Sequence, residues 1–341
     1  MPVSSAVADP YTTDGQGEPQ PGTVPAEYKT LVAGLLALLA AHVAPKPGVE
    51  TSVWAAWVMA RLPMFRAQIM ARLRELELQV GVLVVETIAS LVAKAAGEAA
   101  RDVSWHGPLP GPDPDIARSL MDALRAAHVR IPVVLEDTAR RAVDAGRRAV
   151  GDPTPDIQRV LDDLAGRGIT GYTDRAGRRW NLETYVETVT RAHYAQAAMD
   201  TYLAVIGRAG VGIVQVSRNV TSCPRCAPWQ GRNLSIDGSR AGEYQLRSPG
   251  GHVKTVVVAG TLQEAKDAGL LHPWCRHRLA PVMAGKSTRL GRGPNVDQVA
   301  RARRRYTART ARAWQRRGKV AITPQARQTA ATRARQWQGR D

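Results

Sequence analysis

The stretch Ile69-Met-Ala-Arg-Leu-Arg-Glu-Leu-Glu-Leu-Gln-Val-Gly-Val-Leu83 is the strongest fold signal in this chain, because its apolar residues recur every three or four positions. That spacing places them on one face of an α-helix. Ile88, Leu91 and Val92 prolong the apolar face toward Ala100. The stretch therefore predicts one long helix with a heptad-like seam.

Toward the N-terminus, the apolar spacing predicts helices over 26–44 and 51–62, each stopped by a following proline. Residues 1–25 are polar and rich in proline and glycine, which predicts a flexible arm without a signal peptide. The apolar run over 30–43 is shorter than the roughly 20 residues that cross a bilayer, so we expect no membrane anchor. Three cysteines are too few for a disulfide framework, so we expect a soluble protein made in a reducing cytoplasm.

Toward the C-terminus, two Ala/Arg-rich helices are expected over 116–129 and 133–150, so nearly all of 26–150 is predicted to be helical. A Gly-Asp-Pro-Thr-Pro linker follows, and the composition changes after it. A short helix over 156–167, a turn region over 170–180 and a long helix over 182–208 are expected next, the last capped by Asn181.

Alternating β-branched residues predict strands over 211–220 and 252–259, with a short third strand over 233–237 and a short helix over 261–268. The predicted fold class is α+β and mostly α. It comprises a flexible arm (1–25), a helical docking domain (26–150), a small α+β module (156–285) and a basic helical tail (286–341), broken near Gly318 and Pro324.

The tail carries most of the formal net charge of +17, since residues 286–341 contain 16 basic and 2 acidic residues. Such an uncompensated run binds polyphosphate with strong salt dependence and little sequence preference. An acidic protein surface is the alternative partner. The cations expected to contact nucleic acid are Arg301, Arg303, Arg304, Arg305, Arg309, Arg312, Arg316, Arg317 and Lys319.

All three cysteines lie in one module, as Cys223-Pro-Arg-Cys226 and His272-Pro-Trp-Cys275-Arg-His277. A Cys-x-x-Cys turn supplies two thiolates, and a distant Cys and His complete a tetrahedral zinc site by pinning a second loop. The expected ligands are Cys223, Cys226, Cys275 and one histidine, for which His277 and His272 compete. Four protein ligands make such a site structural and not catalytic. The alternative is free or redox-active thiols with histidines that only cap loops.

Catalytic patterns are missing from the sequence. No histidine is followed two residues later by Glu, as a zinc deaminase requires, and no G-x-S-x-G, H-E-x-x-H or P-loop pattern occurs. Arg191, His193 and Asp200 share the helix 182–208, where a salt-bridge or capping role is favoured over catalysis. The acidic residues near the Cys/His module form no spaced pair, and they are Asp237, Glu243 and Glu264.

Residues 168–281 resemble the phage minor capsid protein 2 family, relatives of the phage Mu F-like head morphogenesis proteins. The resemblance rests on Gly168-Ile-Thr-Gly-Tyr-Thr-Asp-Arg-Ala-Gly-Arg-Arg-Trp180, Val214-Gln-Val-Ser217, Trp229-Gln-Gly231 and the two Cys/His segments, in this order and spacing. Leu182, Thr184-Tyr185, Thr190-Arg191, Ala265 and Gly269-Leu270 also match. Trp274 departs from the pattern, where a turn residue such as Asn is expected.

The resemblance implies a minor structural protein of the phage head, without established enzymatic activity, located in the virion and in the host cytoplasm during assembly. It implies association with the portal, and with the major capsid protein as a further candidate, and non-specific contact of the tail with packaged double-stranded DNA. Mu F-type relatives tend to carry Cys-Arg-Cys at 275–277, which favours His277 as the fourth ligand. The alternative function is a metal-dependent nuclease or ADP-ribosyltransferase-like enzyme.

The helical region 26–100 is expected to be an interaction surface, and oligomers through these helices are a further expectation. Its apolar seam is longer than a single exposed helix needs, and Trp54 and Trp57 are of the residue type enriched at interface anchors.

Overall fold

The computed structural model describes residues 22–173, 177–218, 222–272, 275, 277–287, 290 and 298–339, so most of the predicted arm over 1–25 lies outside the described residues. The chain divides into two compact units. Unit 1 contains residues 85–118 and 191–301, and unit 2 contains residues 22–84, 119–190 and 302–339, as far as these ranges are described.

Both units are discontinuous along the chain, because the unit boundaries at 84/85, 118/119, 190/191 and 301/302 each fall within a helix. The units therefore do not follow the consecutive ranges 26–150, 156–285 and 286–341. That these ranges fold independently stays a prediction.

The helices over residues 22–167 match the predicted ones closely, except that α3 begins seven residues before Ile69. They are α1 (Val24–Val43), α2 (Thr51–Ala60), α3 (Leu62–Val103), α4 (Pro114–His128), α5 (Ile131–Arg148) and α6 (Thr154–Arg167). The α3 seam is confirmed, since Ile69, Leu73, Leu76 and Val80 are all buried. Sequence periodicity succeeds here because α3 buries one continuous face in the core.

A buried polar network joins three helices of unit 2. The imidazole of His128 on α4 lies between the Tyr28 hydroxyl on α1, at 2.6 Å from Nε2, and the Glu77 carboxylate on α3, at 3.0 Å from Nδ1. Burial lowers the pKa of His128 and raises the pKa of Tyr28. A network of this kind fixes which residues face each other, because leaving one buried polar group without its partner is costly.

Among the described residues, the helices α1 and α3 are long and apolar enough to cross a membrane by length and composition. Their most apolar windows are 50% and 28% buried in this structure. A mostly buried core helix of a soluble protein can have the same length and apolar composition, so these two helices are weak evidence for a membrane span. The length of the apolar run over 30–43 therefore does not exclude a membrane span, since α1 extends beyond that run.

The predicted turn region over 170–180 contains a short antiparallel pair of strands, β1 (Thr170–Thr173) and β2 (Arg179–Asn181). The glycine and aspartate residues of this region predicted turns, so these short strands were not predicted. Asn181 then caps α7 (Leu182–Arg208), as predicted, because its side-chain oxygen accepts from the backbone N–H of Glu183 at 3.0 Å.

Unit 1 is built on a five-stranded sheet with strand order β5-β6-β4-β3-β7. Its elements are β3 (Ile213–Val216), β4 (Asn233–Ser235), β5 (Gly242–Arg247), β6 (Val253–Thr261), the short helix α8 (Leu262–Asp267) and β7 (Leu279–Pro281). Strands β3, β4 and β6 and helix α8 are confirmed predictions. β5 and β7 were not predicted, because β5 is largely polar and β7 has only three residues.

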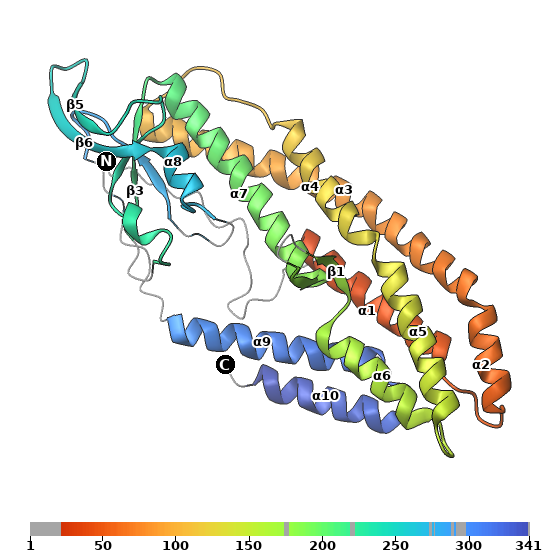
Figure 1. Cartoon of the computed structure of the whole chain (residues 1–341). Helices are drawn as coiled ribbons and strands as arrows, with labels where there is room; N and C mark the ends of the chain where they lie inside the picture. Colours follow the sequence, from red (N-terminus) through yellow and green to blue (C-terminus); the bar gives the residue numbers. More distant parts are fainter. Residues whose placement is uncertain are drawn as a thin grey trace. The chain divides into compact units, whose positions relative to one another are not determined.

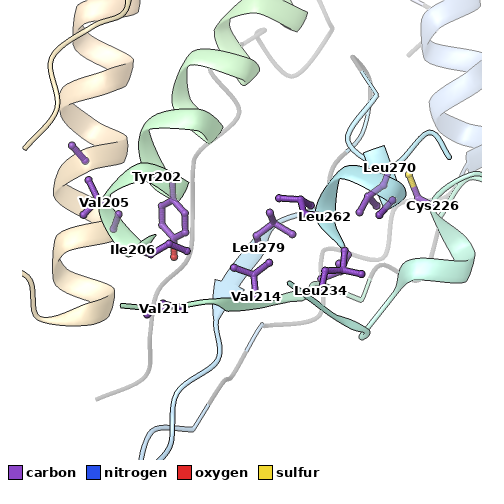
Figure 2. Close-up of a cluster of buried hydrophobic side chains, with 14 residues drawn as sticks. Tyr202, Val205, Ile206, Val211, Val214, Cys226, Leu234, Leu262, Leu270 and Leu279 are labelled. Carbon is purple, nitrogen blue, oxygen red and sulfur yellow. The ribbon is translucent and has the colours of Figure 1, made fainter. Parts of the chain in front are cut away.

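The core of unit 1 lies where α7 and α8 cover the sheet (Figure 2). Tyr202 and Ile206 from α7, Val214 from β3 and Leu262 from α8 meet in one buried cluster, which also contains the Cys226 side chain. The sheet therefore supports the cysteine turn directly.

The tail folds as two helices, α9 (Gln298–Lys319) and α10 (Pro324–Gln338), with the predicted break between them. The helices run side by side and antiparallel (Figure 1). Tyr306 and Trp337 pack edge to face with ring centroids 5.7 Å apart, and an added methyl group at Gly318 would contact Ala330. The tail is thus a folded helical hairpin of unit 2.

Candidate metal centre and basic tail

The turn after β3 holds the first two cysteines. The backbone N–H groups of Cys226 and Ala227 both donate to the Cys223 carbonyl, at 3.0 Å each, which closes the Cys-x-x-Cys segment into a tight turn. A short 3₁₀ helix (Ala227–Trp229) follows at once. The turn directs both thiols to one side of the loop, as a metal knuckle requires.

The second loop, between α8 and β7, brings the remaining sulfur and both imidazoles to this turn. The Cys275 Sγ lies 3.6 Å from the Cys226 Sγ and 3.3 Å from the His277 Nδ1. The His272 Nε2 lies 3.3 Å from the Cys223 Sγ. The structure therefore gathers all five predicted donors, in two overlapping groups that share Cys226.

Within each group of three, the measured separations are close to the edges of a tetrahedral zinc site. With Zn–S near 2.3 Å and Zn–N near 2.05 Å, the edges of a tetrahedron are about 3.8 Å between sulfurs and about 3.5 Å between sulfur and nitrogen. Thiolate and imidazole are also the donors that zinc prefers. The donor types thus fit a zinc ion, and each of the two groups supplies three of the four ligands that such a site needs.

The two histidines differ in their surroundings. His277 is 7% exposed and its Nε2 lies 3.5 Å from the Ser222 hydroxyl, so its Nδ1 is held toward Cys275. His272 is half-buried and presents Nε2 to Cys223. Both arrangements suit a ligand, so the choice between them stays open. Ser222 matches the family pattern in the sequence, but a contact with the histidine was not predicted for it.

The pKa values of all three thiols in the cluster are shifted. Burial, with the neighbouring thiols of Cys275 and Cys223, raises the pKa of Cys226, and burial raises the pKa of Cys275. Burial also acts to raise the pKa of Cys223, but hydrogen bonds from Cys226 and Arg225 outweigh it and this pKa is lowered. The thiols of Cys226 and Cys275 therefore resist becoming thiolates, and a divalent ion bound beside them would stabilise the thiolate form.

A model of a known protein family matches the part of the chain that contains the Cys/His cluster and the basic tail. The family model described as phage minor capsid protein 2 matches residues 130–340. The chain belongs to this family. No curated protein and no solved structure matches the chain. Membership makes this protein a structural component of a phage virion, and the match covers the Cys/His module and almost the entire tail.

Of the acidic residues considered for an enzymatic site in this minor capsid protein, Glu264, Asp237 and Asp200 have structural roles. Glu264 and Thr261 form a capping box at the start of α8, and Asp237 accepts from the Ser239 backbone N–H at 3.0 Å. Asp200 on α7 lies 3.9 Å from Lys266, which agrees with the salt-bridge interpretation. Among the described residues, no acidic pair faces the cysteines.

The basic tail divides into exposed and buried cations. Arg303, Arg304, Arg305, Arg309 and Lys319 are exposed, Arg312 and Arg317 are half-buried, and the side chain of Arg301 lies outside the described residues. Arg327, Arg333 and Arg335 on α10 are exposed as well. The hairpin thus presents arginines from both helices to solvent.

Arg316 does not belong to the exposed set. Its side chain is 11% exposed and pairs with the Glu183 carboxylate on α7 at 2.5 Å. Its Nε also donates to the Ala165 carbonyl at 2.8 Å, near the end of α6. Arg316 is therefore an unsuitable contact for nucleic acid, contrary to the sequence prediction, because its guanidinium already bonds to Glu183 and to the Ala165 carbonyl inside the protein.

Proposed function

We propose that this chain is a minor structural protein of the phage head that associates with the portal and acts in head assembly and in DNA packaging or delivery. The observation that carries the proposal is the family match over residues 130–340. Association with purified portal particles tests it: the protein should co-sediment with them, and failure to do so in low and moderate salt contradicts the portal assignment.

The surface proposed for the portal is the exposed side of α3 in unit 2. Leu78 and Val82, one turn apart, are 77% and 58% exposed, although the opposite side of the same helix is buried. Trp54, proposed as an interface anchor from the sequence, is instead 3% exposed and packs against Gly146 of α5. A pair of exposed apolar side chains at helical spacing suits a groove on a partner.

The variant Leu78→Glu/Val82→Glu tests this surface. It should abolish co-sedimentation with portal particles, because it places two charges in an apolar contact. Val133→Glu, at a 56% exposed position of α5, is the matched control and should leave co-sedimentation unchanged. If both variants co-sediment with portal particles to the same extent, α3 is not the portal surface.

A structural zinc ion in the Cys/His cluster is the second part of the proposal. The residues that would hold it are Cys223, Cys226, Cys275 and either His277 or His272, and the donor spacing described above supports this assignment. Bound zinc would supply cross-linking of two loops and no catalytic chemistry, because four protein ligands leave no open position. Elemental analysis of the full chain should give one equivalent of zinc.

Non-specific contact with packaged double-stranded DNA is the third part. The exposed arginines of α9 support it, because Arg303, Arg304, Arg305 and Arg309 form no ion pair with a described acidic residue. Free guanidinium groups bind phosphate oxygens in a bidentate manner. Scrambled duplex sequences should therefore bind equally well.

The test replaces these four arginines by glutamine. The variant should bind duplex DNA more weakly, and its slope of log affinity against log salt should fall by about 0.9 for each phosphate contact that is lost. The matched control removes four arginines that pair with acidic residues elsewhere, namely Arg118, Arg125, Arg140 and Arg159. If log affinity against log salt has the same slope for both variants, the four arginines do not contact DNA, and the tail binds an acidic protein surface instead.

A further inference from the structure

Strand β5 forms one edge of the sheet of unit 1. It pairs with β6 on one side, and no described strand pairs with its other side (Figure 1). Glu243, Gln245 and Arg247 are exposed, whereas Tyr244 and Leu246 are half-buried and pack against a small apolar cluster on the opposite face. The six residues contain neither proline nor lysine, the residues that commonly block pairing at sheet edges.

The hydrogen bonds of the hairpin show which backbone groups face outward. The Ser248 N–H donates to the His252 carbonyl at 2.9 Å, next to the paired residues Arg247 and Val253. Backbone groups of successive strand residues alternate in direction, so the even-numbered residues of β5 bond to β6. The N–H and C=O groups of Glu243, Gln245 and Arg247 consequently point to the open edge.

We propose that β5 pairs antiparallel with β5 of a second copy of this chain, about a two-fold axis at Gln245. In this register Gln245 faces the partner's Gln245, and Glu243 faces the partner's Arg247. Each outward-facing residue then meets another outward-facing residue, which gives three hydrogen-bonded pairs and about six backbone hydrogen bonds. The two sheets join into one continuous sheet through a self-complementary contact.

Side-chain chemistry selects this register. It places two Glu–Arg pairs, one at each end of the contact, on the exposed face of the sheet. Neither Glu243 nor Arg247 has an ion-pair partner among the described residues, so both are free to form these pairs. Tyr244 meets the partner's Leu246 on the other face and extends the apolar cluster. A shift by two residues sets Glu243 against the partner's Gln245 and removes both ion pairs.

Sedimentation of the full-length protein over a range of concentrations tests the proposal, together with charge variants of β5. The unaltered protein should show a reversible monomer–dimer equilibrium. Glu243→Arg and Arg247→Glu should each weaken the dimer at least about tenfold, because each places like charges opposite one another twice. The double variant Glu243→Arg/Arg247→Glu restores opposite charges in both pairs and should restore the dimer.

Arg208→Glu, at an exposed position near the end of α7, is the control for a general effect of charge and should leave the equilibrium unchanged. A protein that stays monomeric at the highest soluble concentration overturns the proposal. So does a dimer that the single variants leave intact, or one that the double variant fails to restore. Circular dichroism identical to the unaltered protein confirms that each variant is folded.

Discussion

Replacing Arg316 by methionine should destabilise unit 2 by about 3–5 kcal/mol, which is the usual loss when one partner of a buried ion pair is removed. The structure accounts for a value of this size. The Glu183 carboxylate is 12% exposed and would keep its charge without a cation, and the Ala165 carbonyl would lose a 2.8 Å hydrogen bond. The position of Glu183 in the first turn of α7 offsets only about 0.3–1 kcal/mol.

Urea unfolding followed by circular dichroism measures the total loss, and hydrogen exchange of the α9 amides locates it. A loss of this size raises the open population of α9 about 100- to 5,000-fold. Arg312→Met, one turn earlier and half-buried, is the control and should change stability by less than about 0.5 kcal/mol. The double variant Arg316→Met/Glu183→Met should recover most of the loss, because an apolar pair can replace a buried ion pair.

Equal unfolding of the Arg316→Met and Arg312→Met variants would refute this account of how the tail is anchored. The tail also makes other contacts with unit 2. Gln158 on α6 accepts from the Ile322 backbone N–H at 2.8 Å, and Val320 is fully buried. Truncation at Gly285 would therefore expose part of the unit 2 core, and point variants are the sounder test of DNA binding.

Three further outcomes are expected. Cys275→Ser should lower the zinc content to well below one equivalent, measured by elemental analysis, and lower the melting temperature of unit 1, measured by calorimetry. A full equivalent of zinc with an unchanged melting temperature would exclude Cys275 as a ligand. Burial raises the pKa of Asp102, so the ionised carboxylate destabilises unit 1 above the folded pKa, and this destabilisation disappears as the pH falls. The variant Asp102→Asn should therefore raise the urea midpoint at pH 7 and change it little near pH 4. A difference in midpoint that is the same at both pH values would refute the reasoning. Gly146→Val should lower stability by about 1–3 kcal/mol or more, because a Cβ at this position would lie 2.7 Å from the Trp54 ring; an unchanged thermal midpoint would contradict the close packing of α2 and α5.

The parts of the fold that periodicity governs could be predicted from the sequence. The α3 seam from Ile69 to Val80 and the capped start of α7 at Asn181 both depend on residues within a few turns of each other. β5 and β7 could not be predicted, because their pairing depends on strands elsewhere in the chain and not on their own composition.

The candidate site shows the same division. The spacing of the cysteines predicted that the two loops would meet, and Cys226 shares one group of donors with Cys223 and another with Cys275. The burial of Arg316 could not be predicted, because its partner Glu183 lies 133 residues away and nothing near Arg316 in the sequence is acidic. A charge run indicates how many cations a segment has, and only the fold decides which of them face solvent.

The most direct test of the central claim, that this protein is a minor structural component of the phage head, is quantitative mass spectrometry of purified virions. We predict that the chain is present at far fewer copies than the major capsid protein and that protease degrades it only after the capsid is opened. Absence from purified virions, with the protein abundant in the lysate, would contradict the claim.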